Sequence, residues 1–199
     1  MPSYLHPDVL DGGPLALKSA AVKARLVKTY AFGDAFATVT AASNVLATVD
    51  MGASDITISA DGTGRKNVSG TKSGAASGNS NQYDAGTATG GSTTTLADTS
   101  KSWVTNAHAN RAVTIVSGTG AGQSGRIASN TATALTITKA WAVAPDATSV
   151  YRISDDLHWI IDDNSAKVLA AYDETTNQPV TSGNTVNFPA LTNNWPQPA

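Results

Sequence analysis

The chain has 199 residues, a net charge of −2 and only 14% charged residues, which gives neither a basic footprint for nucleic acid nor a polybasic patch for a membrane surface. It has no cysteine, so disulfides and thiolate metal sites are excluded, and no apolar run approaches the length of a membrane span. The segment Met1–Asp8 lacks the basic and apolar regions of a secretory signal. The remainder is rich in Thr, Ser, Gly and Ala and poor in aromatics, a composition that favours strands and turns and is common in extracellular and virion proteins.

The first element that we expect is an amphipathic helix over residues 15–30. Leu15, Val22, Leu26 and Tyr30 recur at spacings of four and seven, which would place them on one helix face. Lysine and arginine fall largely on the other flanks. Such dispersed cations on an acidic chain indicate a solvated helix face and not a helix that binds nucleic acid.

After residue 30 the hydrophobic period changes to two. Residues 56–59 alternate cleanly before a turn at 61–64. Residues 69–95 are low in complexity and consist mainly of Gly, Ser, Asn and Thr, so they predict a flexible connector or a long loop, because they bury too little to order themselves. Strand-like runs then return, at 111–117, 125–129, 134–138 and 149–153.

The last third of the chain predicts a hairpin and an extended tail. Residues 157–161 and 166–172 are apolar runs on either side of a polar turn, which is typical of a β-hairpin. The tail from residue 188 carries three prolines and should run extended over a surface. Four tryptophans are spread along the chain as core anchors of small β units would be, at Trp103, Trp141, Trp159 and Trp195.

The stretch GAGQSG at residues 120–125 satisfies the G-x-G-x-x-G pattern of dinucleotide-binding proteins. That pattern requires a helix after the glycines and an acid at the end of the next strand. Here a Thr-rich alternating run follows, and Asp146 lies in a turn after Pro145. We therefore predict a hairpin loop whose glycines supply positive φ, with no nucleotide and no other cofactor.

Other residues that could carry chemistry are few. His6, His108 and His158 are far apart in sequence and show no metal-ligand spacing. The acid pairs at 155–156 and 162–163 could hold Ca²⁺, but they lack EF-hand spacing and are interpreted as solvated turns. A carboxylate pair for glycoside hydrolysis is less favoured still, because few aromatics are present to line a sugar site. We predict no catalytic residue, no metal ligand and no enzyme activity.

Between residues 93 and 153 a dense set of features occurs in a fixed order. These features are a Thr-Leu-x-Asp opening, Trp103, a Gly-x-Gly-x-Gly-Gln turn, Asn130-Thr131, Trp141, Pro145-Asp146 and a Ser149-x-Tyr151-x-Ile153 close. The string resembles a small β module that recurs in structural proteins of tailed bacteriophages. The module appears in several kinds of virion protein, so the resemblance implies a virion protein and not one particular role.

The flanking segments resemble a second phage pattern. It consists of an "HPDVLDGG" start with a helix, a "VLA…ITISADGTGRK" block and an "LHWIIDD…VLAAYD…VTSGNTVNFPAL" block. In shorter phage proteins of this kind the two β blocks are joined by a short linker. The resemblance therefore implies a mainly β fold, β-sandwich or barrel-like, with one N-terminal α-helix and two small domains. Residues 1–84 with 155–199 would form the virion-docking domain, and residues 85–154 an inserted, projecting domain.

The resemblance implies a structural role, most directly that of a head decoration or cement protein on the capsid exterior. The expected partners are the major capsid protein and further copies of the chain, with a homotrimer favoured, and neither nucleic acid nor membrane. The protein would be made in the host bacterial cytoplasm and located on the virion. The alternatives are a tail, neck or fibre component and a module that adheres to the host surface; a glycosidase or esterase tailspike is a more distant one.

Attachment to the virion should depend on apolar burial and backbone pairing, because the chain has no cysteine and little charge. The extended ends, 1–11 and 187–199, carry prolines and aromatic residues and could lie across a neighbouring subunit. The alternative is that each end packs on its own domain. The candidate interaction residues are Tyr4, Leu5, Phe188 and Trp195.

Overall fold

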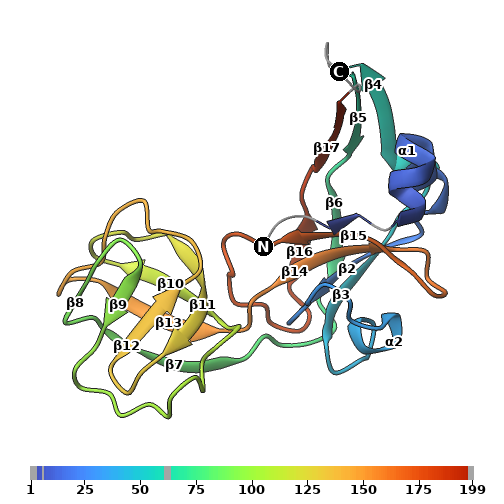
Figure 1. The fold of residues 1–199 in the computed structure, drawn as a ribbon. Helices are drawn as coiled ribbons and strands as arrows, with labels where there is room; N and C mark the ends of the chain where they lie inside the picture. The colour runs from blue at the N-terminus through green and yellow to red at the C-terminus, as the bar shows by residue number, and fades with distance from the viewer. Residues whose placement is uncertain (1–3, 6, 61–63, 197–199) are drawn as a thin grey trace. The chain divides into compact units, whose positions relative to one another are not determined.

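The structure, a computed structural model, describes residues 4–5, 7–60 and 64–196. The chain folds into two compact units (Figure 1). Unit 1 contains the residues up to Asn79, His158–Asp173 and those from Val180 onward. Unit 2 contains Ser80–Leu157 and a separate piece, Glu174–Pro179. Unit 2 begins earlier and ends later than the inserted domain that we predicted at 85–154, and it also includes a segment from further along the chain.

Unit 1 is built mainly from antiparallel strands, in agreement with the mainly β prediction. Its elements are β1 (Tyr4–Leu5), α1 (Pro7–Ala20), β2 (Lys23–Val27), α2 (Phe36–Val39), β3 (Val45–Asp50), a 3₁₀ turn (Ala53–Asp55), β4 (Ile56–Ala60), β5 (Gly64–Ser69), β6 (Lys72–Ala75), β14 (His158–Asp162), β15 (Val168–Asp173), β16 (Thr185–Phe188) and β17 (Thr192–Pro196). They form a five-stranded sheet in the order β1-β15-β14-β2-β3, a pair β16-β6 and a three-stranded sheet β17-β5-β4.

The helix lies earlier in the chain than the hydrophobic spacing predicts. Helix α1 ends at Ala20 and is kinked at Gly13, whose φ of 63° is outside the helical region. Residues 23–27, expected to be helical, instead form strand β2 between β14 and β3. The predicted N-terminal helix is therefore present, but of the range 15–30 only residues 15–20 belong to it, and the prediction is wrong for residues 21–30. A spacing of four residues fits both a helical and an alternating pattern, and it could not distinguish the two.

The predicted hairpin of the last third is confirmed and forms the middle of the five-stranded sheet. Strands β14 and β15 pair antiparallel, with Ile160 opposite Ala171, and every residue of β14 is buried. A strand that is buried on both faces consists of a continuous run of apolar residues, and the sequence has such runs at 157–161 and 166–172. Ile160 and Ala171 pack with Val27, Tyr30 and Val39 in one hydrophobic cluster.

The C-terminal segment runs as a long ribbon beside the chain from residue 64 to 75. Strand β16 pairs with β6, and after an interruption at 189–191 strand β17 pairs with β5. The tail is extended, as its prolines predict, and it is a paired strand of unit 1 for most of its described length.

Unit 2 consists entirely of strands and turns. Its strands are β7 (Gln82–Thr87), β8 (Gly90–Gly91), β9 (Thr95–Ala97), β10 (Ala112–Ser117), β11 (Ser124–Asn130), β12 (Ala134–Ile137) and β13 (Val150–Ser154). They follow the order β7-β13-β10-β11-β12-β9-β8, so β7 and β8 are the two outer strands of the sheet. These two strands are consecutive parts of a single segment, 82–91.

That segment closes the sheet of unit 2 into a barrel. The Ala88 amide donates to the Ser149 carbonyl at 2.8 Å, next to β13, while the adjacent Thr89 amide donates to the Ala97 carbonyl of β9 at 2.7 Å. One continuous segment therefore pairs with both ends of the strand order. A closed barrel has no unpaired edge, and its side chains fill the interior. Those of Leu96, Ile115, Ile127, Leu135, Tyr151 and Ile153 do so here.

The low-complexity stretch 69–95 is ordered, contrary to the prediction of a connector or loop. It supplies β6, β7, β8 and the start of β9. At Gly86 a Cβ atom would lie 2.7 Å from Asp98 Oδ2 and 2.9 Å from Tyr151 Oη. This glycine is required because the backbone passes close to a buried hydrogen-bonded pair, and its presence does not indicate flexibility.

Residues 174–179 act as a clip on unit 2. The Asn177 side chain is buried, accepts a hydrogen bond from the Leu157 amide at 2.7 Å and donates to Ser124 Oγ at 3.0 Å. Its carbonyl accepts a hydrogen bond from Arg152 at 2.9 Å, and its φ of 45° is left-handed. Asparagine tolerates this backbone conformation and also supplies both side-chain hydrogen bonds.

We predict that Asn177→Gly, which keeps the left-handed backbone but removes the side chain, lowers the free energy of unfolding of unit 2 by about 1–3 kcal/mol, because the buried Leu157 amide loses its acceptor. Urea unfolding monitored by tryptophan fluorescence measures the change. Gln178→Ala, at an exposed neighbouring position, is the control and should be neutral. Equal stability of the Asn177→Gly variant and the wild type would show that the clip contributes nothing.

Candidate functional site

The structure places the N-terminal candidates in unit 1. Tyr4 and Leu5 form β1, whose backbone pairs with Ala171 and Ala170 of β15. The strand extends the five-stranded sheet by one short edge element. The backbone of these two residues thus pairs within unit 1.

The C-terminal candidates also pair within their own chain. Phe188 is fully buried, and its ring meets that of Trp159 edge-on at a centroid distance of 5.2 Å. Phe188 is thus a core residue of unit 1 in this structure, where we considered it as a residue that could contact a neighbouring subunit. Trp195 lies in β17, opposite Arg65 of β5. The four candidate residues are distributed over three different sheets.

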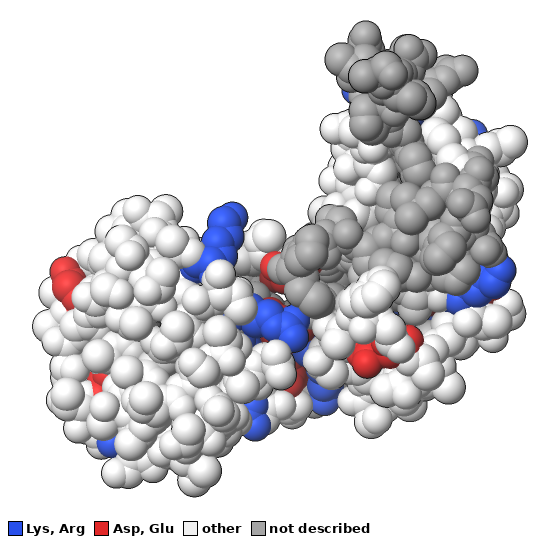
Figure 2. All heavy atoms as spheres, in the orientation of Figure 1, with Lys and Arg blue, Asp and Glu red and all other residues white. Residues whose placement is uncertain are grey.

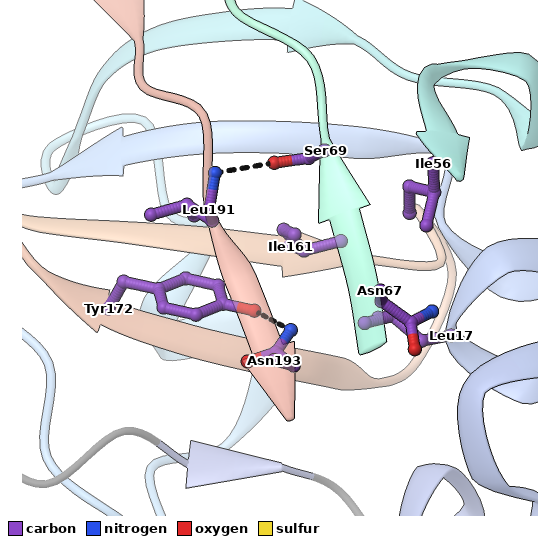
Figure 3. Close-up of a pocket in the computed structure, with 8 residues that line it drawn as sticks. All are labelled: Leu17, Ile56, Asn67, Ser69, Ile161, Tyr172, Leu191 and Asn193. Atoms are coloured by element: carbon purple, nitrogen blue, oxygen red, sulfur yellow. Dashed lines mark hydrogen bonds between the residues drawn. The ribbon is translucent and has the colours of Figure 1, made fainter. Parts of the chain in front are cut away.

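A small cavity lies beneath the C-terminal segment (Figure 3). Leu191 and Asn193 reach it from one side, and it is also lined by Leu17, Ile56, Asn67, Ser69, Ile161 and Tyr172. Its volume is about 10 Å³, which is room for about one water molecule. A cavity of this size cannot hold a cofactor.

Polar contacts around this cavity fix the C-terminal segment to unit 1. Asn193 donates to Tyr172 Oη at 2.5 Å, and the Leu191 amide donates to Ser69 Oγ at 3.0 Å (Figure 3). Burial raises the pKa of Tyr172 to about 12, so its hydroxyl stays protonated at neutral pH. The hydrogen bonds around the cavity hold β17 and the residues before it on unit 1.

The first acid pair is buried and partnered within unit 2. Asp155 accepts hydrogen bonds from the Asn81 amide at 2.6 Å and from Tyr83 Oη at 2.8 Å. Asp156 pairs with Arg126 at 3.1 Å. The interpretation as a solvated turn is wrong for both residues, because a buried carboxylate needs such partners.

The second pair is divided between a buried ion pair and a turn. Asp162 is buried and pairs with Arg25 at 2.6 Å. Burial alone would raise the pKa of Asp163, but three backbone amides that donate to it, those of residues 165–167, lower this pKa to about 2. Asp163 is a turn residue, as expected. Among the described residues no group of three His, Asp or Glu could hold a metal ion.

Residues 118–123 form the turn of the β10–β11 hairpin, which confirms the predicted hairpin loop, and the last two residues of GAGQSG begin β11. Gly118, Gly120 and Gly122 all have positive φ, between 79° and 88°. At Gly118 a Cβ would lie 1.9 Å from the Thr148 carbonyl oxygen. Gln123 fastens the turn by hydrogen bonds with the Val143 backbone. The glycines serve a tight turn against the neighbouring 143–148 segment and precede a strand where a dinucleotide site would require a helix.

Two of the three histidines fall on described residues. His158 is buried in β14, with Asp173 3.8 Å away. His108 is buried in unit 2, where its Nδ1 lies 2.9 Å from Arg111 Nη1. His6 lies outside the described residues. The structure does not bring the two described histidines to one metal site.

His108 belongs to a network that sequence reasoning missed. Arg111 stacks on the Tyr83 ring at 3.5 Å from its centroid, and the Trp103 ring meets His108 edge-on at 5.4 Å. Trp103 Nε1 donates to Asp84 at 2.6 Å, and Lys101 pairs with the same carboxylate at 2.8 Å. These contacts hold the long 98–111 connection against β7. No spacing rule links these residues, because they are brought together only by barrel closure.

Surface charge offers little more. The face of unit 2 seen in Figure 2 is covered mainly by uncharged residues. In the part of the chain that the structure describes, no helix is both long and apolar enough to span a bilayer. Comparison with protein families, with curated proteins and with solved structures finds no match to this chain.

The burial of Phe188 predicts a stability effect. Phe188→Ala should lower the free energy of unfolding of unit 1 by about 3–5 kcal/mol, because it removes a fully buried ring that packs on Trp159. Thermal unfolding followed by circular dichroism measures this loss, with the exposed Phe32→Ala as the control. An unchanged melting temperature would instead return Phe188 to the set of docking candidates.

His108 predicts a pH dependence for unit 2. Burial, and then the nearby Arg111 charge, lower its pKa from 6.5, with Asp84 acting in the opposite sense and Lys101 in the same one. Below about pH 6.5 the unfolded chain binds a proton that the folded unit does not, so the free energy of unfolding should fall as the pH decreases, until the folded pKa is passed.

Urea unfolding of the wild type and of His108→Gln, between about pH 7 and pH 5, tests this effect, because the variant should lose most of the slope in that range. A slope that is identical in the two proteins would assign the dependence to other groups.

Proposed function

We propose that the protein is a non-enzymatic structural protein of a tailed-phage virion, and that it is a head decoration or cement protein on the capsid exterior. One observation carries the proposal: the segment that resembles the phage β module, 93–153, falls wholly within unit 2, whose barrel is closed. A self-contained barrel is suited to being carried as an added module. The resemblance of the flanks supports the same assignment for unit 1.

The division of labour between the units follows from their strand edges. In unit 2 one segment pairs with both β13 and β9, which leaves less open edge for a partner strand than the sheets of unit 1 do. Unit 1 has open sheets whose end strands are β1, β3, β4, β6, β16 and β17. Docking on the major capsid protein by backbone pairing is therefore proposed for unit 1, and unit 2 would project.

A decoration protein stabilises the capsid because it binds the assembled lattice and not the free subunits, so binding shifts the equilibrium toward the lattice. Contacts repeated on symmetry-related copies add avidity, and a trimer would match the three-fold positions of a capsid. Since both described ends pair within unit 1, docking would use its sheet edges and faces in place of free arms.

The test uses heads of the encoding phage that lack this protein. Purified full-length chain should bind with saturation, add regular density over the whole head in cryo-electron microscopy and raise the temperature at which heads release DNA. The unassembled major capsid protein is the control, and the chain should not bind to it. Density confined to the tail or neck would contradict decoration and support the tail, neck or fibre alternative.

A further inference from the structure

Strand β4 is an edge strand that helix α1 contacts but that has no charged residue, proline or bulge of its own. It lies at the end of the order β17-β5-β4, and no strand among the described residues pairs with its outer side. Its five residues, ITISA, include no charge and no proline, and its register with β5 has no bulge. Natural proteins block exposed edges with lysine, proline or bulges, and an edge that lacks them is an association site.

The other open edges of unit 1 are different. Strand β17 contains two asparagines and ends in Pro196, and β16 is followed directly by Pro189. The outer side of β3 is covered in part by the chain after β6, where the Ser77 amide donates to the Leu46 carbonyl at 2.7 Å. Strand β1 has only two residues. Asparagine and proline are poor strand formers, so β4 is the edge best suited to accept a strand.

The hydrogen bonds of β5 show which backbone groups of β4 face outward. The Ser69 amide donates to Leu191 on the β17 side, and the Gly70 amide donates to Asp55 on the β4 side. Backbone groups alternate along a strand, so Thr57 and Ser59 direct theirs toward β5. The N–H and C=O groups of Ile56 and Ile58 therefore point away from the sheet.

We propose that two copies of this chain pair through the outer edges of β4, antiparallel about a two-fold axis at Ile58. The outward amide and carbonyl of Ile58 then meet the same groups of the partner's Ile58 and form two hydrogen bonds. On one face Ile58 lies beside its own copy, and on the other face Thr57 lies opposite the partner's Ser59. Apolar residues thus meet apolar ones and hydroxyls meet hydroxyls, and two three-stranded sheets become one of six strands.

Charge does not oppose this pairing. Asp55, which precedes β4, is already paired with Lys72 at 2.8 Å. An edge contact of five residues per chain is smaller than the roughly 1,000 Å² of a stable interface, so the association should depend on protein concentration. The contact is two-fold and isologous, and it is distinct from the trimer expected on a capsid.

Thr57→Glu/Ser59→Glu tests the proposal, because each new carboxylate would face another across the two-fold axis. In the single chain Ser59 lies opposite Lys66, so a glutamate there is compatible with folding. We expect about a tenfold or greater weakening of the dimer in sedimentation equilibrium. Thr57→Lys/Ser59→Glu, which sets opposite charges face to face, should restore wild-type affinity to within about threefold.

The other edge of the same sheet supplies a matched control. Thr192 and Asn194 of β17 lie opposite Val68 and Lys66, as Thr57 and Ser59 of β4 do. Thr192→Glu/Asn194→Glu therefore adds the same charges beside the same neighbours and should leave dimerisation unchanged. A wild type that stays monomeric, an unaffected Thr57→Glu/Ser59→Glu variant or an equally weakened control would each overturn the proposal.

The absence of cysteine allows a second test that does not depend on that variant's folding. Thr57→Cys/Ser59→Cys should form covalent dimers on mild oxidation, because positions 57 and 59 face each other across the axis. Covalent dimers support the pairing, and a product that stays monomeric contradicts it. Head binding by a monomeric Thr57→Glu/Ser59→Glu variant would leave the decoration function standing, whereas loss of head binding with an unchanged dimer constant would assign this edge to the capsid and overturn self-pairing.

Discussion

The structure of unit 2 depends on the change of partner between two adjacent residues. Ala88 donates to the chain beside β13 and Thr89 donates to β9, so one segment joins the two ends of a seven-strand order. Without that change, β7 and β8 would leave two unpaired edges on a chain with little charge to protect them. With it, the interior is filled by Leu96, Ile115 and their neighbours.

Because the barrel of unit 2 is closed, backbone pairing with a partner would take place mainly at the strand edges of unit 1. The sheets of unit 1 end in strands whose outer groups are open, and the C-terminal ribbon occupies one of those positions by pairing with β5 and β6. Phe188 and the polar contacts of Asn193 hold that ribbon in place. A virion protein with this construction would dock through unit 1 and vary its exposed surface through unit 2, and both proposals above follow from that asymmetry.

Much of the strand content could be predicted from local pattern, and the exceptions have physical causes. The β14–β15 hairpin and the GAGQSG turn were accessible because apolar runs and glycines act locally. The C-terminal boundary of the helix could not be predicted, because Val22, Leu26 and Tyr30 fit both the helical period and the alternating period of a strand. The 69–95 stretch was misjudged because its glycines permit close packing, as at Gly86, and composition alone cannot separate that role from flexibility.

The candidate site was less accessible to sequence reasoning than the fold. Phe188 looked like part of a free arm, since its burial depends on Trp159, which lies far away in the sequence. Asp155 and Asp156 looked solvated for the same reason, because Tyr83 and Arg126 become their partners only after folding. Asn177 carries no local signal for its position in the clip. Each of these roles is set by contacts between distant residues.

Native-state hydrogen exchange measured by NMR tests barrel closure most directly. The amides of Ala88 and Thr89 should be protected to the same degree as those of Val113 and Ile115 in β10, which lies between β13 and β11, because both pairs of amides would open only when unit 2 unfolds. Exchange of Ala88 and Thr89 at the rate of exposed amides, with Val113 and Ile115 still protected, would show that the sheet is open and would contradict the closed barrel.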